Sequence, residues 1–159
     1  MRKLKYYILT IFISLSCSEK NPEWKAEREA SIHFGGEPKN ENFVLSFHRK
    51  GDTLIYNYVG KIDSTKTINI QKVENSNILF FGFGKFIESN RKSFRNQKLK
   101  DLEFKYYHLE NPGTHGTGPI LFNSEYGLLA INNVYGPTIV FLEVKDNNLT
   151  EMIINNLNE

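Results

Sequence analysis

Apolar and polar residues alternate with a period of two along much of this chain. The clearest example is a pair of runs, residues 43–48 and 54–58, in which every second residue is large and apolar. Between them, residues 49–52 read Arg-Lys-Gly-Asp, a sequence that favours a tight turn. Because successive side chains of a β-strand point to opposite faces, the pattern predicts a β-hairpin with one buried face.

The same reasoning predicts strands at residues 67–73, 78–83, 102–108, 120–122, 126–131 and 138–144. Residues 78–83 are apolar on both faces, which is typical of a central strand covered on both sides, and Gly82 and Gly84 indicate a bend or bulge. Residues 89–100 and 111–119 are predicted to be connections. Leu149, Met152, Ile153 and Leu157 recur at helical spacing, so we expect a short C-terminal helix capped by Asn148 or Thr150.

These elements predict a mainly β protein: a single antiparallel β-sandwich or open barrel of about eight strands with a short C-terminal helix. The alternative is an α+β fold in which that helix packs on one face of a curved sheet. Residues 18–30 are polar apart from Trp24, and Asn21-Pro22 favours the start of a helix. We expect this segment to pack weakly.

The amino terminus has a separate pattern. Residues 1–5 contain three cations, and the mostly apolar run at residues 6–15 is too short for a transmembrane helix, which needs about 20 residues. The only cysteine, Cys17, follows directly after Ser16. Here the chain resembles the lipoprotein class of bacterial signal peptides, although Ser14 stands where that class usually has an aliphatic residue. The resemblance implies cleavage before Cys17 and transfer of a diacylglycerol to its thiol.

The expected organisation is therefore a signal peptide at residues 1–16, a lipidated polar tether at 17–30 and a β-rich globular domain at 31–159. The protein would be exported and anchored in the bacterial cell envelope, with the outer membrane as the expected location; ordinary secretion is the alternative. A single cysteine allows no internal disulfide. The sequence shows no cluster that predicts a metal site or a cofactor.

Net charge does not indicate a nucleic-acid partner. Residues 1–16 carry three of the 20 Lys and Arg residues, which leaves 17 cations against 18 Asp and Glu residues. Locally, five cations occur in residues 91–100 without an acid: Arg91, Lys92, Arg95, Lys98 and Lys100. They are interpreted either as a contact for anionic lipid headgroups or acidic glycans, or as a solvated loop.

Two further features are candidates for ligand contact. His115 lies in the glycine-rich stretch 111–119, where it could either face a ligand or form a solvated loop tip. Six tyrosines could stack on sugars or lie half-buried in the core: Tyr56, Tyr58, Tyr106, Tyr107, Tyr126 and Tyr135.

The leading functional hypothesis is a non-catalytic envelope lipoprotein with a binding or structural role. Its partners would be the membrane, through Cys17, and an envelope protein or glycan. The alternatives are an immunity or inhibitor lipoprotein, and a small envelope hydrolase whose site is assembled from distant residues, including His115.

Overall fold

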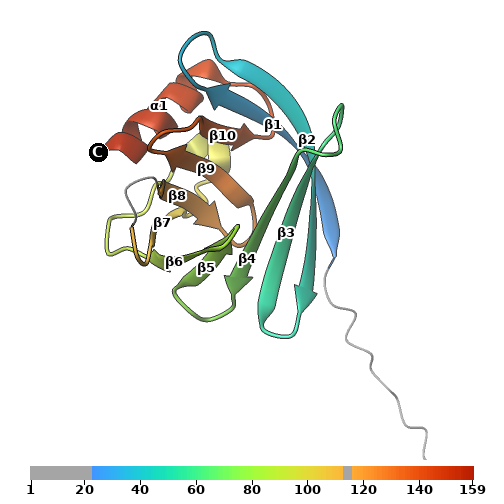
Figure 1. Ribbon diagram of the computed structural model, residues 1–159, viewed down its shortest axis with the longest axis vertical. Helices are drawn as coiled ribbons and strands as arrows, with labels where there is room; N and C mark the ends of the chain where they lie inside the picture. Colours follow the sequence, from blue (N-terminus) through green and yellow to red (C-terminus); the bar gives the residue numbers. More distant parts are fainter. Residues whose placement is uncertain (1–22, 113–115) are drawn as a thin grey trace, which may run out of the picture.

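The computed structural model describes residues 23–112 and 116–159, and in them ten antiparallel strands form one sheet that closes into a barrel (Figure 1). Each strand pairs with its neighbours in the chain, and β1 pairs with β10 to close the ring. The strands are β1 (Trp24–His33), β2 (Lys39–Lys50), β3 (Thr53–Gly60), β4 (Thr67–Val73), β5 (Ile78–Phe81), β6 (Gly84–Glu88), β7 (Lys105–Leu109), β8 (Thr117–Asn123), β9 (Gly127–Asn133) and β10 (Thr138–Leu142). A 3-10 turn, η1 (Gln97–Leu99), and the helix α1 (Asn147–Asn158) complete the described part.

The predicted hairpin is confirmed as β2 and β3. Lys50 pairs with Thr53, which leaves Gly51 and Asp52 as a two-residue turn. In the register of this pair, Phe47 lies opposite Tyr56 and both point into the barrel, where they are buried. The predicted strand at residues 67–73 is confirmed with the same bounds as β4.

Large side chains from the inward faces of the strands fill the barrel. Tyr56 and Tyr58 are completely buried and make edge or tilted contacts with Phe122 and Phe141, at ring-centroid distances of 5.1 and 5.0 Å. The Tyr56 hydroxyl donates to the carbonyl of Ser124 at 2.6 Å, so its polar end is satisfied. The barrel interior is therefore a packed core.

A second core lies outside the barrel, where α1 and residues 89–104 cover the outer face of β7–β10. Leu149, Ile153 and Leu157 of α1 pack there together with Phe94 and Leu99. Figure 1 shows α1 beside β9 and β10. The helix thus lies on one face of the sheet, as the α+β alternative expected, but the sheet is closed.

The fold prediction is correct for a mainly β protein with one antiparallel sheet and one C-terminal helix, and wrong in two details. The sheet is a closed barrel and not a sandwich or open barrel, and in the described residues it has ten strands instead of about eight. The missed strands are β1 and β6. Between Trp24 and Ile32 the inward residues of β1 are Ala26, Arg28 and Ala30, so alternation there lacks large apolar residues.

The expectation of a weakly packed segment that begins a helix is consequently wrong from Trp24 onward. Trp24 stacks on Phe47 at 5.2 Å, and β1 pairs with β2 over its whole described length up to Ile32. The first 22 residues, including Asn21, Pro22 and Cys17, lie outside the described residues.

Two finer predictions also fail. The run 78–83 is not a strand covered on both faces: β5 ends at Phe81, Gly82 and Phe83 form the turn to β6, and Phe83 is exposed. The reason is that α1 covers only the far side of the barrel. The cap of α1 is Asp146, whose carboxylate accepts the Leu149 N–H at 3.0 Å, and not Asn148 or Thr150.

Candidate functional site

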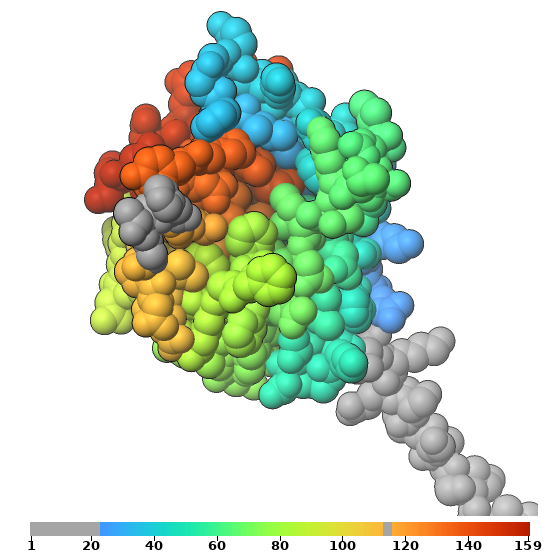
Figure 2. Space-filling model, viewed as in Figure 1, coloured from blue at the N-terminus to red at the C-terminus, as the bar shows by residue number. Residues whose placement is uncertain are grey.

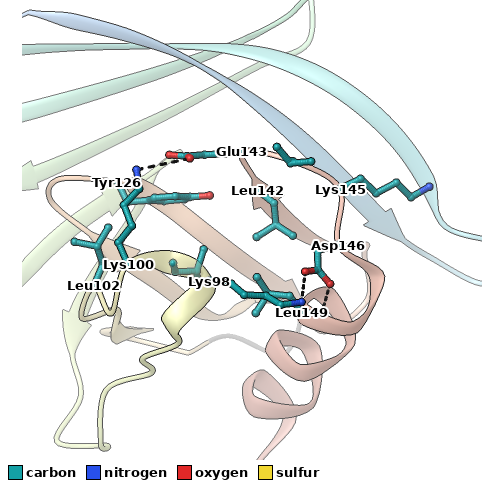
Figure 3. Close-up of a pocket in the computed structure, with 11 residues that line it drawn as sticks. Lys98, Lys100, Leu102, Tyr126, Leu142, Glu143, Lys145, Asp146 and Leu149 are labelled. Carbon is teal, nitrogen blue, oxygen red and sulfur yellow. Dashed lines mark hydrogen bonds and ion pairs between the residues drawn. The ribbon is translucent and has the colours of Figure 1, made fainter.

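A pocket of about 340 Å³ lies on the outer surface of the barrel, between residues 98–102 and the connection from β10 to α1 (Figure 3). Its floor is apolar and consists of Leu99, Leu102, Tyr126, Leu142 and Leu149. The volume is at the small end of the range for ligand pockets. The described segments that form it are far apart in sequence and meet through packing of the outer core.

Two ion pairs border this pocket, and both join residues near η1 to the β10–α1 connection. Lys100 Nζ lies 3.9 Å from Glu143 Oε2, and Lys98 pairs with Asp146. Figure 3 shows the pairs on either side of Leu142, with Lys145 extending away from them. The hydrogen bond from Lys98, followed by that from the Leu149 N–H, lowers the pKa of Asp146.

Tyr126 of the pocket floor also contacts Arg28. The Arg28 guanidinium carbon lies 4.1 Å from the centre of the Tyr126 ring, and Nη2 donates to the Tyr126 carbonyl at 3.1 Å. A second nitrogen, Nη1, lies 3.8 Å from Glu143 Oε1, so Glu143 faces both Arg28 and Lys100. Burial raises the pKa of the Tyr126 phenol to about 12, so this group is neutral at physiological pH.

Two of the other three predicted cations, Arg91 and Arg95, also contact acidic, aromatic or backbone partners. Arg95 pairs with Glu103 at 2.8 Å. Arg91 stacks over the ring of Tyr106 at 4.1 Å and donates to the Asn156 carbonyl at 2.6 Å. Of the five cations, Lys92 alone forms no hydrogen bond or ion pair with a described residue. Most of these cations are therefore tied to the barrel by surface interactions, and an anion contact at residues 91–100 stays a prediction.

A second, more polar pocket of about 510 Å³ lies at the end of the barrel where β1 begins. Lys72 is buried there, donates from Nζ to the carbonyls of Val73 and Ser76 at 2.7 and 2.6 Å, and has a pKa lowered by burial. Beside it Lys105 Nζ pairs with Glu88 Oε1 at 2.7 Å. Sequence reasoning missed this pocket, although Lys72 interrupts the apolar face that Ile68 and Ile70 begin.

The carboxylates of these pockets whose pKa values are shifted, Glu103 and Asp146, are shifted downward. A general acid at neutral pH needs a carboxyl pKa raised towards 7. Here the Ser93 hydroxyl and then Arg95 lower the pKa of Glu103, and Lys98 does the same for Asp146. Within residues 23–112 and 116–159, no three His, Cys, Asp or Glu side chains lie close enough to hold a metal ion.

The remaining candidates separate into two groups. His115 lies outside the described residues, as does Cys17. Five of the six tyrosines are buried (Tyr56, Tyr58, Tyr106, Tyr107 and Tyr126), which removes them as an exposed platform for sugars, whereas Tyr135 is exposed.

Comparison of the chain with protein-family models, with curated proteins and with solved structures finds no match. In the part of the chain that the structure describes, α1 is neither long nor apolar enough to cross a membrane.

Proposed function

We propose that this chain is a lipoprotein of the bacterial cell envelope, anchored through Cys17, with a binding role and no catalytic one. The observation that carries the proposal is the position of the only cysteine, directly after a basic start, a short apolar run and Ser16. The predicted cleavage would make Cys17 the first residue of the mature protein. Two or three acyl chains on it would hold the protein firmly at a membrane.

The position of β1 is compatible with such an anchor. Six residues, 18–23, separate Cys17 from the first residue of β1, Trp24. At full extension this tether reaches about 25 Å, so the barrel would stay close to the membrane that holds the lipid. The end of the barrel at which β1 begins would face that membrane.

A binding role is favoured over catalysis by the chemistry of the described pockets. The pocket beside α1 combines an apolar floor with two closed ion pairs, and the Lys98 hydrogen bond lowers the pKa of Asp146, which stays ionised at neutral pH. It can accept a small apolar group, and it has no base placed against a nucleophile. The hydrolase alternative would depend on His115, whose place the described residues do not include.

The anchoring can be tested by cell fractionation of the wild-type protein, a Cys17→Ser variant and a Ser18→Ala control. We expect the wild type and the control in the membrane fraction, resistant to extraction with high salt. Cys17→Ser should remain unprocessed or leave that fraction. If all three proteins fractionate alike, the anchoring proposal is wrong.

A further inference from the structure

Five large apolar side chains stand in solvent on turns at a single end of the barrel. Strands alternate in direction, so the turns after β1, β3, β5 and β9 all lie at the end opposite the start of β1. The exposed residues on them, which we call the crown, are Phe34 (67% exposed), Ile62 (96%), Phe83 (113%), Val134 (60%) and Tyr135 (66%). In Figure 2 the light-blue turn after β1 and the green turn after β3 project as separate lobes at the top and upper right.

This distribution is not the ordinary scatter of exposed apolar residues. Single exposed apolar residues are normal on a protein surface, whereas several that gather in one region mark an interaction site. Here four separate turns each carry such residues at their tips. The other large exposed residues, Phe80, Val144 and Met152, lie on β5, after β10 and on α1.

Three ion pairs lie on or beside the crown turns. Lys61 binds Glu27 at 2.6 Å, Lys85 binds Glu110 at 2.6 Å, and Lys66 pairs with Glu41. The other charged residues on or beside these turns are Glu37, Lys39 and Asp63, two acids and one cation, so the turns carry no excess of cations. Anionic bilayers attract proteins through such an excess of Lys and Arg, so this charge pattern does not favour a lipid surface.

The short tether also disfavours contact between the crown and the anchoring membrane, if the protein is anchored at Cys17 as proposed above. The ten residues of β1 rise about 33 Å along the strand, or about 25 Å along a barrel axis from which strands tilt by about 40°. Residues 18–23 would have to run fully extended back along the barrel wall for the crown to touch the anchoring membrane. Such an ordered tether is entropically costly, so the crown faces away from that membrane.

We infer that the crown is a docking surface for a folded protein partner in the cell envelope. The partner presents an uncharged, apolar surface with separate recesses for the turn tips. Aromatic and aliphatic anchors surrounded by satisfied polar groups are the pattern that dominates binding energy at protein interfaces.

Photo-crosslinking in living cells tests this inference on the full, anchored chain. p-Benzoylphenylalanine is introduced in place of Ile62 or Phe83 in the crown, and in place of Val144 or Met152 as matched exposed controls. We expect one protein to be crosslinked from both crown positions and from neither control, and its identity follows from mass spectrometry. No crosslinked protein at the crown, or equal crosslinking from Val144 and Met152, would overturn the inference.

The identified protein is then purified, and its affinity is measured for the wild-type chain, for Ile62→Ser/Phe83→Ser and for the control Val144→Ser. The crown variant should bind at least 10-fold more weakly with an unchanged melting temperature, and the control should bind like the wild type. Equal affinities of all three would refute the docking surface.

Flotation with neutral and with anionic phospholipid vesicles, using Cys17→Ser protein, tests a lipid occupant. If vesicles bind this protein and the crown substitutions abolish the binding, the crown binds a membrane and not a protein partner. The crosslinking result does not depend on the lipid: if Cys17 is not modified but the crown still crosslinks its partner, the anchoring proposal fails and the docking surface stands.

Discussion

Single residues inside the barrel show how closely its polar groups and its packing are matched. Tyr58 is completely buried, and its hydroxyl oxygen accepts the backbone N–H of Leu128 at 2.7 Å. Burial raises the pKa of this phenol, so it remains neutral and can serve as an acceptor within the core. The contact is possible because the neighbouring residue is Gly127, with φ of +91° and no side chain to separate the two strands.

Gly127→Ala should destabilise the protein strongly. A Cβ atom at this position would lie 2.4 Å from the Tyr58 hydroxyl oxygen, so strand β9 or the tyrosine must move. Backbone strain and overpacking together should lower the free energy of unfolding by about 3–5 kcal/mol. Chemical denaturation measures this value.

Gly51→Ala is the matched control, since Gly51 has φ of +61° and no atom within 4 Å of an added Cβ. The Gly51→Ala variant should lose only the free energy that an alanine pays for a left-handed backbone conformation, about 1–2 kcal/mol. Equal losses for the two variants would contradict the role assigned to the Gly127–Tyr58 contact.

At the scale of elements, residues 89–104 are held on the barrel by ion pairs with partners from distant segments. The sequence showed the cluster of cations clearly, but their partners Glu143, Asp146 and Glu159 are 43 to 68 residues away. No local pattern reveals such pairs. The sequence therefore predicted the cluster of cations but not the ion pairs that they form.

Strand prediction from alternation was successful where each inward position is large and apolar, as in β2, β3 and β4. It missed β1, whose inward face includes Ala26, Arg28 and Ala30, and β6, where Phe86 is the single buried residue. The closure of the barrel was not predictable either, because it depends on pairing between the two ends of the chain, β1 and β10. The pocket beside α1 could not be anticipated for the same reason.

Acid should loosen the attachment of residues 89–104. The pKa values of Glu103 and Asp146 are lowered in the folded protein, Glu103 first by the Ser93 hydroxyl and Asp146 first by Lys98. A carboxyl with a lowered folded pKa contributes stability above its unfolded pKa, near 4, and this contribution is lost as the pH falls through the folded value. The melting temperature should therefore fall between pH 5 and pH 3.

The fall should be shallower in a Glu103→Gln/Asp146→Asn variant, which begins with a lower melting temperature at pH 6. Asn is chosen at position 146 because it still caps α1. If the melting temperatures of wild type and variant fall equally across this pH range, these carboxylates do not stabilise the fold.

At the scale of the whole molecule, the barrel depends on its first strand. β1 is the only described strand that joins the carboxyl-terminal strand β10 to the amino-terminal half of the sheet, through pairs from Glu29↔Leu142 to His33↔Thr138. Without β1, both β2 and β10 would become open edges with unpaired N–H and C=O groups. The fold therefore begins at Trp24 and not at residue 31.

A chain that begins at Glu23 should unfold in one cooperative thermal transition, unaffected by a reductant or a chelator. A chain that begins at Ser31 lacks seven residues of β1 and should lose this transition and aggregate. Circular dichroism at increasing temperature distinguishes the two. Equal stability of both chains would contradict the role given to β1 in closing the barrel.

At this scale we propose that the barrel lies at a membrane, with its crown of apolar turn tips directed away from it. The anchor is the claim on which that orientation depends, and the mass of the mature amino-terminal peptide, isolated from membranes, tests it most directly. We expect a chain that begins at Cys17 and carries a diacylglycerol on the cysteine sulfur. A mature protein that begins at any other residue, or an unmodified Cys17, would contradict the account.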